Sequence, residues 1–162
     1  ELEKLNILTG EKVWIIFVDI HILDYDGNLF DTASLAALAA LMTTKVPIER
    51  FRSTLEKLQE KLPSIKQYLD NNPKDFPLPL IEPPISCTAA KYNGVVVMDP
   101  SLDEEEIAEA RLTVATDKNE DIRAMQKGLN GSFNKEEIKK VIKASIDNGK
   151  EIRKILYKST GK

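Results

Sequence analysis

Residues 23–34 read LDYDGNLFDTAS, in the order expected for a loop that holds a phosphate. An apolar stretch leads into the Asp26-Gly27 turn, and a helical pattern begins directly after it. Backbone N–H groups at a helix start attract anions, so such junctions often hold phosphate. A working site also needs a cation, and no lysine or arginine lies between Lys12 and Lys45. The residues alone therefore favour a structural turn.

A second group of residues suited to chemistry is an acidic cluster that follows a short apolar stretch. Its members are Asp99, Asp103, Glu104, Glu105 and Glu106. Clustered carboxylates bind Mg²⁺ beside substrate phosphates. They also occur at ordinary helix starts, where the helix dipole favours negative charge. Composition alone favours the solvated helix start.

The chain has one histidine and one cysteine, which limits other chemistry. His21 could act as a general base, but no serine or cysteine lies near it in the sequence, so a structural role is favoured. A zinc site is excluded. Cys87 lies in an apolar run that predicts burial, and a single cysteine rules out an internal disulfide. Cysteine usage therefore predicts a reducing, cytoplasmic location.

The charge balance argues against strong autonomous binding to nucleic acid. The formal net charge is −3 and the pI is about 5.4, whereas such binding needs a basic face. Lysines and arginines alternate with acidic residues along the chain, which is typical of solvated helix faces. No apolar stretch reaches the roughly 18 residues of a membrane span, so no membrane partner is expected.

Hydrophobic periodicity predicts an α/β (mixed α+β) fold with helices packed on mixed sheets. Strands are expected at residues 13–24, 85–91, 95–99, 111–116 and 122–126, and helices at 32–43, at 49–62 and after a capping box of Asn134 and Glu137. Asp31 is expected to cap the first helix, and Asn93-Gly94 to form a hairpin turn. Residues 1–46 are read as the end of a first half, 47–84 as an insertion or linker, and 85–162 as a second half. Both halves are βαβα-type.

Three stretches together resemble the RNase PH family, and more narrowly the non-catalytic RNase PH-like ring subunit of the archaeal exosome. They are VDIHILDYDGNLFDTASLAALAAL, PPISCTAAKYNGVVVMDPSLDEEE and MQKGLNGSF, in the family's order. The resemblance implies an RNase PH-like fold in which residues 1–162 form one domain lacking its N-terminal third. A first residue other than methionine agrees with that expectation.

The resemblance also implies a disabled phosphate site. In active relatives the turn reads D-G-G-T-R, and its arginine grips the attacking phosphate. Here Asp26 and Gly27 match the pattern, Asn28 replaces the second glycine, Leu29 the threonine, and Phe30 the arginine. Residues 27–30 are therefore expected to form a degenerate phosphate-binding turn, and no catalytic residue is expected in this chain.

The acidic cluster resembles the family's D-L-N-Y-x-E-D pattern less closely. Asp99 matches the first aspartate, Glu104 the glutamate, and Glu105 stands at the second aspartate. The resemblance implies at most a vestigial metal site at Asp99 and Glu105. No cofactor is expected for this chain; Mg²⁺ belongs to the assembled complex, and phosphate is used by the partner.

The function implied is that of a structural and RNA-guiding subunit. Three copies would alternate with three catalytic RNase PH-like subunits in a hexameric ring that degrades RNA 3′→5′ by phosphorolysis. RNA and RNA-binding cap proteins are the further partners expected, although the sequence does not identify the RNA-contacting residues. Two alternatives stay open: a phosphorolytic exoribonuclease active by itself, and a stand-alone binding module.

Overall fold

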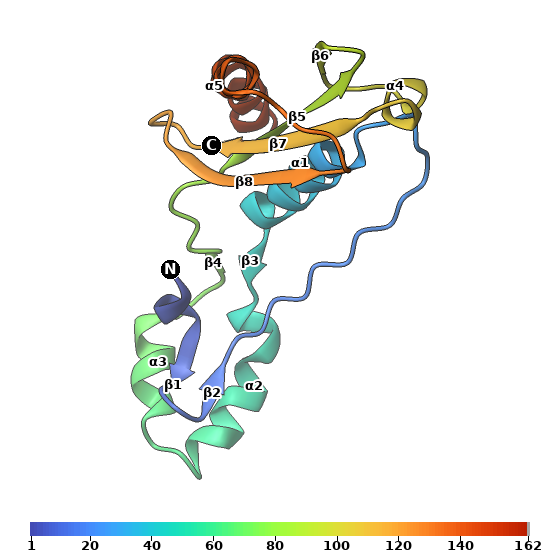
Figure 1. The fold of residues 1–162 in the computed structure, drawn as a ribbon. Coiled ribbons are helices and arrows are strands. Elements are labelled where there is room, and N and C mark those ends of the chain that lie inside the picture. Colours follow the sequence, from blue (N-terminus) through green and yellow to red (C-terminus); the bar gives the residue numbers. More distant parts are fainter. Residues whose placement is uncertain (162) are drawn as a thin grey trace. The chain divides into compact units, whose positions relative to one another are not determined.

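The computed structural model describes residues 1–161, which form two compact units (Figure 1). The first unit contains residues 1–19 and 40–81, and the second contains residues 20–39 and the chain from residue 82 on. Helices and antiparallel strands occur in both units, so the predicted mixed α/β class is confirmed. No helix within residues 1–161 is long and apolar enough to cross a membrane.

The second unit is built on a four-stranded antiparallel sheet with the order β6-β5-β7-β8. Its strands are β5 (Ile85–Tyr92), β6 (Val95–Met98), β7 (Ala110–Thr116) and β8 (Ile122–Gly128). All four correspond to predicted strands. Asn93 and Gly94 join β5 to β6 with φ values of 46° and 78°, the positive values that a tight hairpin turn needs.

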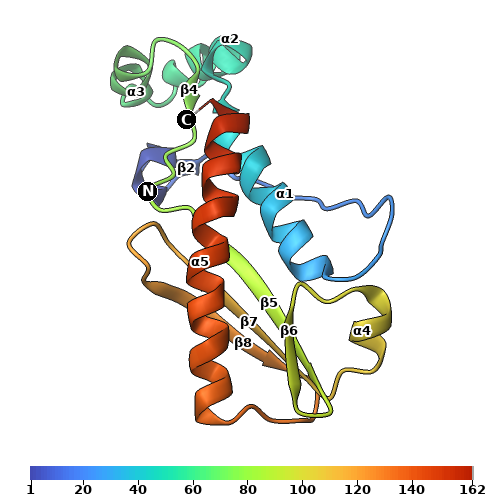
Figure 2. The same ribbon diagram turned by 90° about the horizontal axis from the view of Figure 1, so that it is seen from above.

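A long helix, α5 (Lys135–Thr160), packs on this sheet (Figure 2). Alternation along β7 turns Leu112 and Val114 toward the helix, where they meet Ala89 and Val141 in a buried cluster. The predicted capping box is confirmed. Asn134 accepts N–H bonds from the helix start, and the Glu137 carboxylate accepts the Asn134 N–H at 2.7 Å.

The first helix, α1 (Leu29–Thr43), begins earlier than predicted, and the prediction that Asp31 caps it is wrong. Asn28 is the capping residue: its carbonyl accepts the Thr32 N–H at 3.3 Å, and its side-chain oxygen accepts the Asp31 N–H at 3.4 Å. The Asp31 carboxylate instead accepts the backbone N–H of Thr88 in β5 at 2.7 Å. Strand β6 pairs with β5 only from Ala89 onward, so Asp31 occupies an edge position that β6 leaves open.

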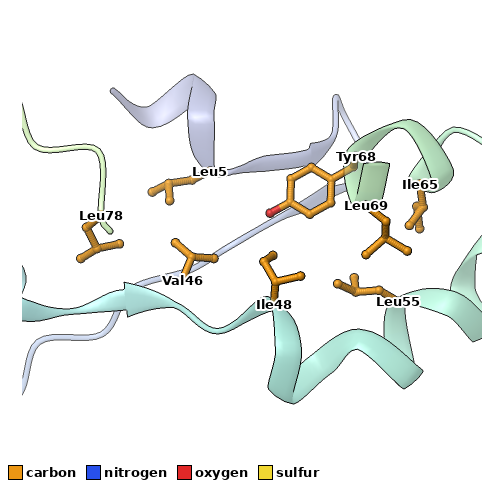
Figure 3. Packing of buried hydrophobic residues seen from close by; sticks show 8 residues of the cluster. All are labelled: Leu5, Val46, Ile48, Leu55, Ile65, Tyr68, Leu69 and Leu78. Carbon is orange, nitrogen blue, oxygen red and sulfur yellow. The ribbon is translucent and has the colours of Figure 1, made fainter. Parts of the chain in front are cut away.

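The first unit has short strands and two helices around its own core. Its elements are a 3-10 turn (Leu2–Leu5), β1 (Asn6–Leu8), β2 (Lys12–Val13), β3 (Lys45–Val46), α2 (Ile48–Gln59), α3 (Ile65–Asn71) and β4 (Phe76–Pro77). Figure 3 shows the buried side chains that join them, among them Ile48 and Leu55 of α2 and Ile65 and Leu69 of α3. The interruption predicted at Pro63 falls between the two helices, and α3 was not predicted.

The prediction of one long strand at residues 13–24 is wrong. Only Lys12–Val13 forms a strand, and residues 14–24 pair with no other strand among residues 1–161. Alternating apolar side chains indicate a strand, but a strand exists only where a neighbour satisfies its backbone N–H and C=O groups. Apolar side chains here are accordingly exposed, with Phe17 at 81% and Leu23 at 97%.

Candidate functional site at the start of α1

The turn before α1 packs closely, at Gly27, against the backbone of residues 100–102, which follow β6. Gly27 has a φ of 100°, and a Cβ added to it would lie 2.5 Å from the carbonyl oxygen of Pro100 and the carbonyl carbon of Ser101. Only glycine fits both the positive φ and this close approach. The turn that the sequence predicts is therefore fixed in place by a loop distant in the sequence.

Asn28, the next residue, forms a polar network at the centre of the site. Its buried side-chain amide donates to Asp31 at 2.9 Å and to Asp99 at 2.6 Å. The Asp31 carboxylate also accepts the Thr88 hydroxyl at 2.8 Å. Since that bond uses the Thr88 proton, the hydroxyl of Thr113, 2.8 Å away, donates to Thr88. Both amide protons of Asn28 are thus already bound to carboxylates.

The two carboxylates of the expected vestigial metal site have separate protein partners. Asp99 accepts from Asn28, whereas Glu105 accepts the hydroxyl proton of Tyr25. That hydrogen bond is the main reason why the pKa of Tyr25 is raised above its usual value. Within the described part of the chain, no group of three or more histidine, cysteine or acidic side chains is placed to hold a metal ion. Asp99 and Glu105 are therefore each held by a different protein group, and the vestigial metal site stays a prediction.

A small hollow of about 280 Å³ lies at the turn. It is lined by Asp24, Tyr25, Asp26, Gly27, Leu29 and Thr32. Two of these side chains are acidic and none is basic, so the hollow repels a phosphate at neutral pH instead of attracting it.

Phe30 does not line that hollow, and a cation lies against its ring. The guanidinium carbon of Arg111 is 4.1 Å from the ring centroid of Phe30. Arg111 belongs to β7, and sequence reasoning missed this contact because no local pattern links a strand residue to a helix start so far away in the chain. A positive charge is therefore present at this corner, on strand β7 and not on the turn before α1.

The lone histidine and cysteine lie outside this network. His21 is exposed, and no hydrogen bond or ion pair joins it to any of residues 1–161. Cys87 is buried, as predicted, and burial raises the pKa of its thiol to about 12. At neutral pH this cysteine is protonated and unreactive.

Comparisons with known proteins agree with this architecture. Residues 1–47 match domain 1 of the 3′ exoribonuclease family, and residues 82–148 match its domain 2. The exosome complex component Rrp42 of Thermococcus gammatolerans is 45% identical over 162 residues, which is 99% of this chain and 55% of the relative. The Rrp42 of Thermoplasma acidophilum is 41% identical over 156 residues, 96% of this chain and 52% of the relative. The chain thus spans about half the length of these relatives.

Solved structures give the same result. An Archaeoglobus fulgidus exosome with RNA bound to the active site contains a chain 38% identical to this one, with a TM-score of 0.77 over 94% of this chain and 53% of that chain. A chain of an archaeal exosome core is also 38% identical, with a TM-score of 0.79 over 96% and 56% of the two chains. Rice Rrp46, at 14% identity and a TM-score of 0.55, shares the fold alone. The chain belongs to the 3′ exoribonuclease family, the family of RNase PH.

Proposed function

We propose that the protein containing this chain is a non-catalytic structural and RNA-guiding subunit of a hexameric exosome ring. The ring degrades RNA 3′→5′ by phosphorolysis, and this subunit supports the active site of its catalytic partner. The observation that carries the proposal is the corner at the start of α1, where Phe30 occupies the place of the family's phosphate-gripping arginine.

The geometry of the corner supports a loss of phosphate binding in three ways. Both amide protons of Asn28 are bound to Asp31 and Asp99, so neither is available to a ligand. The neighbouring hollow has acidic residues and no cation. Finally, removal of one preorganised donor from a developing anion costs about 3–4 kcal/mol, and replacing a cation with an apolar ring costs at least as much.

The relatives supply the context of the proposal. Proteins similar to this chain are named exosome components, and one similar structure holds RNA at its active site. We therefore infer that three copies alternate with three catalytic RNase PH-like subunits, beneath cap proteins that bind RNA. Inorganic phosphate and Mg²⁺ act at the partner's site, and Asp99 and Glu105 are at most a remnant of such a site in this chain.

A phosphorolysis assay tests the proposal. The full-length protein, its catalytic relative and their mixture are each incubated with 5′-labelled RNA, inorganic phosphate and Mg²⁺, and nucleoside diphosphates are measured. We expect no product from the protein alone and strong stimulation in the mixture. A mixture in which the relative has lost the arginine of its D-G-G-T-R turn is the control, and it should be inactive.

Two outcomes would contradict the proposal. Release of nucleoside diphosphates by the protein alone, or by the mixture with the inactivated relative, would show an enzyme active in its own right. If the protein stays monomeric beside the active relative in size-exclusion chromatography, a stand-alone binding module is the better description.

A further inference from the structure

Arg111 has no acidic or carbonyl partner within residues 1–161. Other arginines of the second unit are bound: Arg123 donates to Asp117, and Arg153 donates to the carbonyl oxygen of Thr116 at 2.6 Å. Arg111 is only partly buried; its guanidinium lies over the ring of Phe30, and its charge also acts on the hydroxyl of Tyr25. Its five N–H donors are therefore available to a ligand.

Within residues 1–161 the guanidinium has no ion pair, but it lies beside two other elements. On one side lies the Phe30 ring, with 4.1 Å between the guanidinium carbon and the ring centroid. Across the sheet, Arg111 is paired in register with Gly128 of β8, and a Cβ at Gly128 would lie 2.9 Å from an Nη atom of Arg111. The glycine thus leaves room for the guanidinium to lie beside β8. Stacking on an aromatic ring orients an arginine without consuming its N–H donors.

Phe30 contributes an accessible aromatic surface to the same place. Its side chain is 44% exposed although it begins a helix whose other large side chains pack more closely. An exposed ring beside an unpaired, oriented guanidinium is the combination that proteins use for single-stranded nucleic acid. The ring stacks on a base, and the guanidinium binds a phosphate through two parallel N–H bonds.

We propose that Arg111 and Phe30 together bind one nucleotide of single-stranded RNA. The proposal rests on the proposed function, since it identifies where an RNA-guiding subunit touches the RNA. An acidic segment of a partner protein would use the guanidinium but leave the ring idle, whereas a nucleotide uses both groups. With a net charge of −3, this chain holds RNA through such a local contact and not through a broad basic face.

The test is RNA binding by the assembled ring, measured by fluorescence anisotropy with a labelled single-stranded oligonucleotide over a range of salt concentrations. Arg111→Gln should weaken binding roughly tenfold and flatten the dependence of log Kd on log salt, because a phosphate contact is lost. Phe30→Leu should also weaken binding roughly tenfold but leave the salt dependence unchanged, because stacking is uncharged. Arg111→Lys should keep the salt dependence of the wild type.

The matched control is Arg50→Gln in the first unit. Arg50 also lies over a phenylalanine, with 5.5 Å between its guanidinium carbon and the ring centroid of Phe51, so this variant removes the same charge from another arginine beside an aromatic ring. It should bind RNA like the wild type. Equal weakening by Arg50→Gln and Arg111→Gln would overturn the proposal, because a general loss of charge would then explain both.

Other outcomes separate this inference from the proposed function. If the wild-type ring forms and binds RNA but neither Arg111→Gln nor Phe30→Leu weakens binding, Arg111 and Phe30 do not bind RNA, and the inference is overturned while the proposed function stands. If Arg111→Gln and Phe30→Leu prevent ring assembly, the pair contacts a protein partner and the RNA proposal is overturned. A wild-type ring that binds no RNA would overturn both.

Discussion

At the scale of single residues, Asn28 decides the character of the site. Its φ is 45°, a left-handed conformation that asparagine tolerates better than most residues, and its side chain links the turn to Asp31 and Asp99. An asparagine that replaces a glycine in a family pattern could be a neutral change. Here its side chain donates to Asp31 and Asp99, and it caps the helix that begins at Leu29.

Asn28→Ala should lower the free energy of unfolding of the full-length protein by roughly 2–3 kcal/mol. The alanine loses the side-chain hydrogen bonds and keeps the unfavourable positive φ. Asn28→Gly loses the same bonds without the backbone strain, so it should cost about 1 kcal/mol less. Urea unfolding measures both values.

The control is Asn119→Ala, at an exposed asparagine of the β7–β8 turn, which should change stability by no more than about 0.5 kcal/mol. Two results would refute the argument: an Asn28→Ala protein as stable as the wild type, or an Asn28→Gly protein less stable than Asn28→Ala.

At the scale of elements, the turn between β7 and β8 depends on one buried carboxylate. Asp117 accepts the backbone N–H groups of Asn119 at 2.8 Å and Asp121 at 3.0 Å, and it accepts the Arg123 guanidinium. Burial alone would raise the pKa of Asp117, but these hydrogen bonds outweigh burial and hold the pKa below its usual value. The charged carboxylate therefore stabilises the hairpin.

Because the pKa of Asp117 is lower in the folded state, its contribution is complete above the pKa of the unfolded chain, about 3.9, and is lost as the pH falls through the folded value. Asp117→Asn should thus unfold at lower urea concentration than the wild type at pH 7. The difference between the urea midpoints of the two proteins should be constant down to about pH 5 and should become smaller below pH 4.

Asp121→Asn, which removes a more exposed carboxylate from the same turn, should be close to wild type throughout. If the difference in urea midpoint between Asp117→Asn and the wild type grows on acidification, the charged Asp117 carboxylate does not stabilise the fold.

At the scale of the whole molecule, residues 14–24 are the unusual segment. From Ile15 onward their apolar side chains are exposed on both faces, with Ile15 at 68% and Ile22 at 57%, and no strand of residues 1–161 pairs with them. Large exposed apolar surfaces mark places where other protein packs. The chain spans about half the length of its relatives, and we expect a strand from protein outside residues 1–161 to pair with this segment.

Hydrogen–deuterium exchange tests this. In the chain of residues 1–162 the amides of residues 15–24 should exchange quickly, and in the full-length protein they should be protected, because a partner strand then binds their N–H groups. The amides of β5, which pairs with β7 from Ile85 to Lys91, are the internal control and should be protected in both. Fast exchange of residues 15–24 in the full-length protein would mean that the segment is not a strand there either.

Much of the second unit followed from local sequence signals. The strands β5 to β8, the Asn93-Gly94 turn and the Asn134 capping box depend on alternation and on residues three apart or closer, so the sequence alone determined them. Local signals failed where a side chain bonds to a group far away in the sequence. Asp31 is predicted to cap a helix, but its carboxylate instead accepts the backbone N–H of Thr88, which is 57 residues away.

The sequence by itself also determined the family, because family membership depends on residue identity and order, and it predicts that Phe30 stands where active relatives have an arginine. Tertiary structure decided what fills the corner. Asn28 donates to Asp99, which is 71 residues away in the sequence, and Arg111 of β7 lies over the Phe30 ring. Folding brings these elements side by side, and no periodicity in the sequence predicts such contacts. Tertiary structure also decided that residues 14–24 form no strand within residues 1–161, since pairing depends on a neighbouring strand that the segment's own pattern cannot supply.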